Sequence, residues 1–263
     1  MKVTQFVRSF ALAAMAIAAI SSSRAEAALL ISDNLDGYAN QAAFDAVWAP
    51  ITTGGTLTSA LSVSAPNSVN YATTAQRNGQ TVAETGVVSG SNIVSFSFDF
   101  YDSNAALAPY RQFANLQDGA SPTSTGQLVS MGLNNNLTSA ADGGNYYMAR
   151  ILGLDGGTGA SAYFKLNNAG APLRSTGWHN LRVDISDLVF NFYVDGFLAQ
   201  TIANTGTARS YETVRLGSGL SSTASANFDN ARLETLQVPE PATLALAGLG
   251  LLGLGSVVRR QHA

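Results

Sequence analysis

The clearest pattern in the chain is an alternation of large apolar and polar side chains between Asn92 and Tyr101. Val94, Phe96, Phe98 and Phe100 occupy every second position of this segment. Because successive side chains of a β-strand point to opposite faces, a period of two places all four on the same face. The pattern predicts a strand with one face buried in a core.

Short apolar segments of the same kind recur along the chain, separated by clusters of Gly, Asn and Asp. The further predicted strands are Ala28–Asn34, Gln127–Leu133, Asn145–Leu152, Ala160–Leu166, Trp178–Ile185, Leu188–Val194, Phe197–Ala203, Thr213–Leu216 and Ala226–Leu236. A short helix or ordered loop is expected at Gln41–Trp48, with Phe44 and Trp48 docked on the core. Many short strands with regular turn signals indicate an all-β fold, an antiparallel jelly-roll sandwich in one domain.

Two dipeptides predict tight hairpins. Asn78-Gly79 lies between Ser68–Thr74 and Thr81–Val88, and Asp195-Gly196 comes just before Phe197. Asn-Gly and Asp-Gly suit two-residue turns because both central residues need a positive φ. The stretch from Asp102 to Thr125 contains two prolines and reads instead as one long loop.

The first 27 residues have the three parts of a secretory signal peptide. Lys2 and Arg8 form a charged start, Phe10–Ile20 an apolar centre, and Ala25-Glu26-Ala27 a small-x-small cleavage site. We expect the mature chain to begin at Ala28. The alternative, an amino-terminal membrane anchor, is disfavoured because the apolar run has only about 11 residues.

The carboxyl-terminal segment 238–263 also has three parts: the motif Pro239-Glu240-Pro241, an uncharged apolar run Ala242–Val258, and the pair Arg259-Arg260. Proline lacks a backbone donor, so the motif should be extended and accessible. Seventeen residues at about 1.5 Å each span roughly 25 Å, the short end of a transmembrane helix. The arginine pair would then stay on the cytoplasmic side.

This ordered combination resembles the PEP-CTERM sorting signal of Gram-negative bacteria. The resemblance implies an inner-membrane-anchored intermediate whose tail is recognised and removed by an exosortase-type transpeptidase. It also implies delivery to the cell surface or the extracellular matrix. The alternative is an ordinary membrane anchor in which the Pro-Glu-Pro motif is only a linker.

Charge and cysteine content restrict what the body, residues 28–237, can do. It carries fifteen acidic and nine basic residues, a formal net charge of −6, and the chain has no cysteine. An acidic surface disfavours nucleic acids and anionic membranes as partners. The lack of cysteine excludes disulfides, thiolate catalysis and thiolate metal sites.

A second resemblance covers the later half of the body. The segments Gly177–Val183 (GWHNLRV), Phe192–Phe197 (FYVDGF) and Ala226–Leu233 (ANFDNARL) resemble strands of laminin-G and concanavalin-like jelly rolls. The resemblance implies the fold, with the last segment pairing near the amino-terminal strand. His179, the only histidine of the body, would need partners for a catalytic or metal role.

Calcium is the candidate metal, since it takes oxygen ligands. Asp33, Asp36 and Asp229 lie on segments that the sandwich should bring together at its edge. The alternative is that Asp33 and Asp36 cap a turn while Asp229 points into water.

Some relatives with the concanavalin-like fold are glycoside hydrolases, which need two carboxyl groups at a fixed separation. The glutamates of the body, Glu84, Glu212 and Glu234, do not have the Glu-x-Asp-x-x-Glu spacing of those relatives. We therefore assign no catalytic residue and expect a non-enzymatic surface or matrix protein with polysaccharide as its candidate partner. A polysaccharide-active hydrolase or lyase on the same fold is the alternative. Candidate sugar platforms are Tyr101, Tyr110, Phe113, Tyr146, Tyr147 and the amides Asn134–Asn136.

Overall fold

The structure, a computed structural model, describes residues 27–119, 126–135, 144–153 and 161–238. Residues 28–236 form one compact unit. The predicted signal peptide and the predicted membrane helix 242–258 lie outside the described residues. Within the described ranges, no helix has the length and apolar character needed to cross a membrane.

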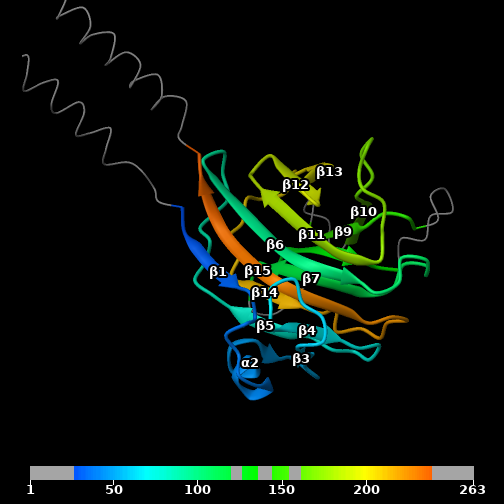
Figure 1. The fold of residues 1–263 in the computed structure, drawn as a ribbon. Coiled ribbons are helices and arrows are strands. Elements are labelled where there is room, and N and C mark those ends of the chain that lie inside the picture. The colour runs from blue at the N-terminus through cyan, green and yellow to red at the C-terminus, as the bar shows by residue number, and fades with distance from the viewer. Residues whose placement is uncertain (1–26, 120–125, 136–143, 154–160, 239–263) are drawn as a thin grey trace, which may run out of the picture. The chain divides into compact units, whose positions relative to one another are not determined.

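The described residues form two antiparallel sheets and one short helix, α2 (Gln41–Val47) (Figure 1). Sheet A contains β1 (Leu29–Asp33), β3 (Thr56–Thr58), β4 (Ser68–Tyr71), β6 (Asn92–Asp102), β11 (Gly177–Ile185), β12 (Val189–Val194), β13 (Phe197–Ala203) and β15 (Ala226–Gln237). Sheet B contains β2 (Ala49–Pro50), β5 (Asn78–Thr81), β7 (Gln112–Gln117), β8 (Leu128–Leu133), β9 (Met148–Leu152), β10 (Ser161–Lys165) and β14 (Thr213–Leu216).

The strand order shows that distant segments become neighbours. Sheet A runs β13-β12-β11-β6-β15-β4-β3, and β1 pairs with β15. Sheet B runs β10-β9-β8-β7-β14-β5-β2. The pairing of the first strand with the closing strand confirms the expectation from the jelly-roll resemblance, with Asp33 opposite Ala231.

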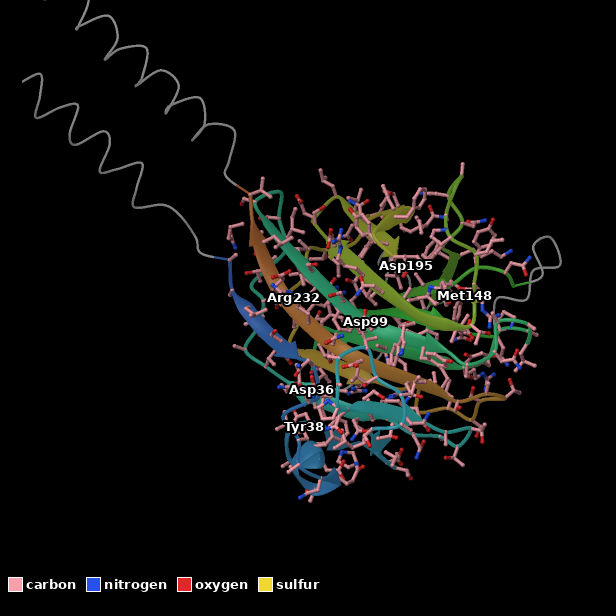
Figure 2. All side chains as sticks on the ribbon, in the orientation of Figure 1. Asp36, Tyr38, Asp99, Met148, Asp195 and Arg232 are labelled. Atoms are coloured by element: carbon pink, nitrogen blue, oxygen red, sulfur yellow. The ribbon has the colours of Figure 1, made fainter. Side chains whose placement is uncertain are left out.

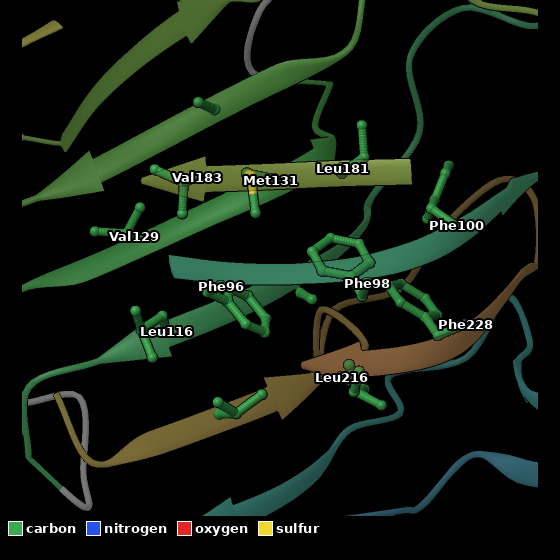
Figure 3. Packing of buried hydrophobic residues seen from close by; sticks show 14 of the residues in the cluster. Phe96, Phe98, Phe100, Leu116, Val129, Met131, Leu181, Val183, Leu216 and Phe228 are labelled. Atoms are coloured by element: carbon green, nitrogen blue, oxygen red, sulfur yellow. The ribbon is translucent and has the colours of Figure 1, made fainter. Parts of the chain in front are cut away.

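The core lies between the two sheets, and β6 is its centre (Figure 3). Val94, Phe96, Phe98 and Phe100 are fully buried, which confirms the predicted alternation. The rings of Phe98 and Phe100 lie 5.6 and 5.3 Å from that of Phe228 on β15. Burial of each such side chain contributes about 1.5–3 kcal/mol, so this face of β6 fixes the register of the sheet.

The predicted helix is also present. Asn40 caps it, because its Oδ1 accepts a hydrogen bond from the backbone N–H of Ala43 at 3.0 Å. Phe44 and Trp48 are both fully buried, as expected. The indole Nε1 of Trp48 donates to Asp33 Oδ2 at 2.8 Å, which ties the helix end to β1.

One of the two predicted hairpins is confirmed. Asp195 and Gly196 have φ values of 50° and 80° and join β12 directly to β13. Two positive φ values in a two-residue loop are the signature of a type I′ turn, whose twist matches that of the flanking strands. This turn places the Asp195 carboxylate beside the start of β11.

The other predicted hairpin is wrong. Asn78 and Gly79 lie within β5 of sheet B, whereas β4 belongs to sheet A. Asn78 is fully buried; its Nδ2 donates to the Trp48 carbonyl and its Oδ1 accepts from the Gly55 N–H, both at 2.7 Å. Gly79 leaves room for Ile51, whose Cδ1 would lie 3.0 Å from an added Cβ. The dipeptide therefore does not form a turn. It packs β5 against the segments that contain Trp48, Ile51 and Gly55.

The expected long loop at 102–125 is wrong as well, since it contains β7. All six residues of this strand are buried. A strand that is covered on both faces shows no apolar–polar alternation toward solvent. Its amide side chains therefore looked like those of a loop, although the strand runs through the middle of sheet B.

Candidate functional site

Strand β7 has two faces with different chemistry. Ala114 and Leu116 belong to the core between the sheets. Phe113, Asn115 and Gln117 alternate with them and lie on the opposite face, which is turned away from sheet A. We call this second face the outer face of sheet B.

The strand register aligns five side chains of the outer face in one line. Arg215 pairs with Asn115, Asn115 with Ser130, Ser130 with Arg150, and Arg150 with Tyr163. We call these five residues the polar row. Strands lie about 4.8 Å apart, so the row extends over roughly 19 Å.

The amides at the centre of the outer face are buried without hydrogen-bond partners. Asn115 is 0% exposed and Gln117 is 1% exposed. In the described structure, neither the nitrogen nor the oxygen of either side-chain amide has a partner. A buried unsatisfied polar group costs about 1–3 kcal/mol, and such groups in native proteins generally serve a purpose. The contacts within the described residues do not explain these two amides, which makes this face the candidate site.

Basic side chains lie along the same face of the sheet. Burial lowers the pKa of both Arg215 and Arg77, and the nearby charge of Arg215 lowers that of Arg77 further. At the other end of the row, the guanidinium of Arg150 lies 5.1 Å from the ring centre of Tyr163, a cation–π contact. Lys165 follows Tyr163 by two residues on β10 and therefore lies on the same face, where it pairs with Met148 of β9.

A small hollow adjoins the row at its Arg150 end. Its volume is about 10 Å³, enough for one water molecule, and it lies between Phe113, Ser130, Gly132, Arg150 and Tyr163. Gly132 has a φ of 139°, and an added Cβ would lie 2.5 Å from the Gln112 carbonyl. Only glycine permits this approach of β8 to β7. Phe113, one of the expected sugar-stacking aromatics, is therefore part of the site.

The predicted calcium ligands accept hydrogen bonds from nearby turns and loops. The two oxygens of Asp33 accept from Leu35 N–H, Trp48 Nε1 and the Tyr38 hydroxyl. Burial and the neighbouring Asp33 raise the pKa of Tyr38, which keeps its proton on the shared hydrogen bond.

Asp36, labelled in Figure 2, and Asp229 both accept hydrogen bonds from the loop before β4. Asp36 Oδ1 accepts from Asn67 N–H at 3.0 Å, and Asp229 Oδ2 accepts from Val63 N–H at 2.9 Å. Burial, with a smaller contribution from Asp36, raises the pKa of Asp229 to about 6. Among the residues the structure describes, no three His, Cys, Asp or Glu side chains form a group that could hold a metal ion. These contacts match the turn-capping alternative for Asp33 and Asp36, whereas Asp229 is only 1% exposed and does not point into water. Calcium binding at the three aspartates stays a prediction.

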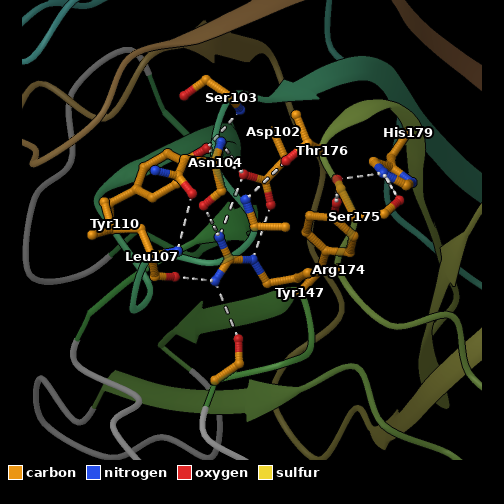
Figure 4. Close-up of polar contacts among 12 residues, drawn as sticks. Asp102, Ser103, Asn104, Leu107, Tyr110, Tyr147, Arg174, Ser175, Thr176 and His179 are labelled. Atoms are coloured by element: carbon orange, nitrogen blue, oxygen red, sulfur yellow. Dashed lines mark hydrogen bonds and ion pairs between the residues drawn. The ribbon is translucent and has the colours of Figure 1, made fainter.

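His179 has the partners that the sequence alone did not provide (Figure 4). Its Nδ1 lies 2.8 Å from Asp195 Oδ2, and its Nε2 lies 2.9 Å from Ser175 Oγ, a spacing like that of a serine hydrolase triad. However, Nε2 is equally close, 2.9 Å, to the carbonyl oxygen of Ser175. The Nε2 atom is therefore shared between the hydroxyl and the backbone carbonyl of Ser175 and is not reserved for the hydroxyl. We interpret the cluster as a clamp on the β12–β13 turn.

A second buried polar cluster lies beside it. The Arg174 Nε donates to Asp102 Oδ2 at 2.9 Å, and the Tyr110 hydroxyl donates to Asp102 Oδ1 at 2.6 Å (Figure 4). Arg174 also donates to the carbonyls of Leu107 and Gly144 at 3.0 and 3.2 Å. This cluster, which the sequence analysis missed, joins the end of β6 to two loops and has no free group for chemistry on a ligand.

Comparisons with known structures return proteins of low sequence identity. An endo-1,3-beta-glucanase from Streptomyces sioyaensis has 14% identity and a TM-score of 0.49, covering 82% of this chain and 99% of that one. An alginate lyase in complex with dimannuronate has 10% identity and a TM-score of 0.45, covering 65% and 76%. A Botulinum neurotoxin serotype D ligand binding domain has 11% identity and a TM-score of 0.48, covering 89% and 52%.

No curated protein sequence matches the chain. One family model does match it, over residues 237–260, and its description is the PEP-CTERM protein-sorting motif. The matched range contains Pro239, Glu240 and Pro241 and confirms the resemblance found in the sequence. The chain is therefore a β-sandwich protein that carries a carboxyl-terminal PEP-CTERM sorting motif.

Proposed function

We propose that this protein is exported, held briefly in the inner membrane by residues 242–258, and released to the cell surface or matrix by an exosortase. The matched sorting motif supports this route. The signal-peptide pattern of residues 1–27 agrees with it. In this proposal the transpeptidase recognises Pro239, Glu240 and Pro241. The membrane helix anchors the protein only until the tail is cleaved.

Mass spectrometry of the mature protein from the producing cell tests this route. We expect a carboxyl terminus close to the Pro-Glu-Pro motif and an amino terminus at Ala28. Glu240→Ala should leave the tail on the protein, whereas Glu234→Ala, six residues earlier in β15, should be processed normally. A mature chain of the wild type that ends at Ala263 would contradict the proposal.

For the sandwich we propose non-enzymatic carbohydrate binding at the outer face of sheet B. The observation that carries this proposal is the pair of buried, unpartnered amides of Asn115 and Gln117. Sugar hydroxyls both donate and accept hydrogen bonds, and an amide offers two donors and an acceptor to match them. Tyr163 supplies aromatic surface at one end of the row. Because Arg150 and Tyr163 are only half-buried, a ligand would meet this end first.

The alternative, a glycoside hydrolase, needs two carboxyl groups across the sugar bond. The outer-face positions described in β5, β7, β8, β9, β10 and β14 include no Asp or Glu. The described face thus offers hydrogen-bonding amides to a glycan, and binding is the function that it supports best.

A glycan array probed with residues 28–237 tests the binding proposal. The described core residues all lie between Ile31 and Leu233, so residues 28–237 contain the complete described core. We expect Asn115→Leu to reduce binding by roughly five- to 150-fold, because a lost hydrogen-bonded pair costs about 1–3 kcal/mol.

The matched control is Asn191→Leu, the same change on β12 of sheet A, which should bind like the wild type. An Asn115→Leu protein that binds normally would contradict the site. A wild-type protein that binds no glycan would contradict the function.

A further inference from the structure

We infer that one end of the folded sandwich rests on the bilayer while the chain is anchored by residues 242–258. This inference rests on the proposed export route and adds an interaction surface on the body itself. The surface consists of four exposed apolar side chains, which we call the apolar end: Leu29, Val87, Leu188 and Val238. Its partner is the lipid interface of the membrane that holds the anchor.

The pairing of β1 with β15 brings both ends of the body together. The two strands are antiparallel, so the start of β1 lies beside the end of β15 (Figure 1). The Ala28 N–H donates to Thr235 Oγ1 at 3.0 Å, and the Thr235 N–H donates to the Ala28 carbonyl at 2.8 Å. The chain therefore enters and leaves the sandwich at the same end, where Leu29 and Val238 lie.

Two further segments reach this end of the molecule. Strand β6 is the neighbour of β15 in the antiparallel sheet A, so it begins where β15 ends. Asn92, the first residue of β6, donates through its Nδ2 to the Val87 carbonyl at 2.9 Å. Val94 of β6 pairs with Ile185, the last residue of β11. The turn after β11, which carries Leu188, therefore lies at this end as well.

The four side chains project into solvent. Leu188 is 69% exposed, Val87 58%, Leu29 54% and Val238 44%. Single exposed apolar side chains are ordinary on a soluble surface, but a group contributed by four separate segments at one end marks an interaction site. Contact with an apolar partner removes these side chains from water and is favourable for that reason.

The length of the connection puts the bilayer within reach of this surface. Only Pro239–Pro241 separate Val238 from Ala242, where the predicted apolar run begins. Four extended residues span at most about 14 Å. The headgroup layer on each side of the hydrocarbon core accounts for roughly 5–8 Å of that distance. With residues 242–258 across the membrane, the apolar end is therefore held at the headgroups.

The connection, and not charge, brings the two surfaces together. The body has a formal net charge of −6, which disfavours binding to anionic lipids from solution. A short tether replaces that binding step by a high effective concentration. The contact is therefore apolar and should not weaken as salt rises. It also fixes how the sandwich stands above the membrane in which the transpeptidase recognises the Pro-Glu-Pro motif.

A fluorescent label at Leu188 tests the inference in the full chain, inserted in vesicles of phosphatidylethanolamine and phosphatidylglycerol. Because the chain has no cysteine, Leu188→Cys directs an environment-sensitive dye to one position. We expect iodide to quench this label about threefold or more slowly than the same label at Leu173→Cys. Leu173 is the matched control, since it is 56% exposed and precedes β11, at the opposite end of sheet A.

Val87→Cys gives a second reading that does not depend on the turn after β11, and its label should be shielded as at Leu188. Raising salt from about 50 to about 500 mM should leave the shielding at both positions unchanged. Shielding that disappears at the higher salt would show attraction between charges and would overturn the inference.

The remaining outcomes separate the inference from the export route beneath it. A full chain that the vesicles do not retain contradicts the anchoring step and, with it, the inference. A retained chain whose labels at positions 87, 173 and 188 are quenched equally overturns the inference and leaves the route standing. Shielding at position 188 that arises only in membranes containing the exosortase assigns the surface to the enzyme and also overturns the inference.

Discussion

Replacing Asp102 by alanine lowers the free energy of unfolding by about 3–5 kcal/mol, because it leaves the Arg174 guanidinium buried without its carboxylate. The two side chains are only 0% and 2% exposed, so water does not replace the lost partner. The Tyr110 hydroxyl loses its acceptor at the same time. For a body of this size the melting temperature should fall by about 10 °C, measured by thermal and urea unfolding of residues 28–237.

The control for this prediction is an exposed ion pair. Glu234→Ala breaks the pair with Arg232, whose side chain is 46% exposed, and should cost less than about 1 kcal/mol. The double change Asp102→Leu with Arg174→Met removes both charges and should recover much of the loss. If Asp102→Ala costs no more than Glu234→Ala, the buried pair does not hold the loops as we describe.

This ion pair substitutes for the covalent links that the chain lacks. Arg174 fastens the loop before β11 to the carbonyls of Leu107 and Gly144, and so joins segments of both sheets. A protein without cysteine must hold such loops through its core and through buried polar contacts. The clamp of His179 on Asp195 works on the neighbouring turn in the same way.

The elements that were predicted correctly carry their signal within a few residues. The β6 alternation, the short helix after Asn40 and the Asp195-Gly196 turn each depend on local geometry, so the sequence shows them directly. The structure of β7 and of Asn78-Gly79 depends instead on segments that are distant in the sequence and bury them, so both predictions failed. An amide on a strand buried on both sides looks the same in the sequence as an amide in a loop.

The candidate site was missed for the same reason. Arg215 and Tyr163 are 52 residues apart in the sequence, and only the register of five strands aligns them with Asn115. The order Gln-Phe-Ala-Asn-Leu-Gln in β7 gave no local signal, because Phe113 and Ala114 are adjacent and break any alternation with the amides. The aspartates expected to bind calcium do lie near the predicted edge. Their carboxylates accept hydrogen bonds from N–H groups of the turns and loops there.

The row also leads to an unusual stability prediction: Asn115→Leu should make the protein more stable. The asparagine side chain is buried with four unmet hydrogen-bonding positions, and leucine has a similar shape and no polar atoms. Removing an unsatisfied amide should raise the free energy of unfolding by about 1–3 kcal/mol. The melting temperature of residues 28–237 should rise by several degrees, while glycan binding falls.

Gln117→Met should change stability in the same direction, since its amide is buried and unpartnered too. Asn191→Leu is the control: its Oδ1 accepts from the Thr201 hydroxyl at 2.9 Å, so its loss should not stabilise the protein. A gain in stability together with a loss of binding is expected where a polar group is kept for function at a cost to the fold. If Asn115→Leu destabilises the protein, the amide has partners within the fold, and the row is structural.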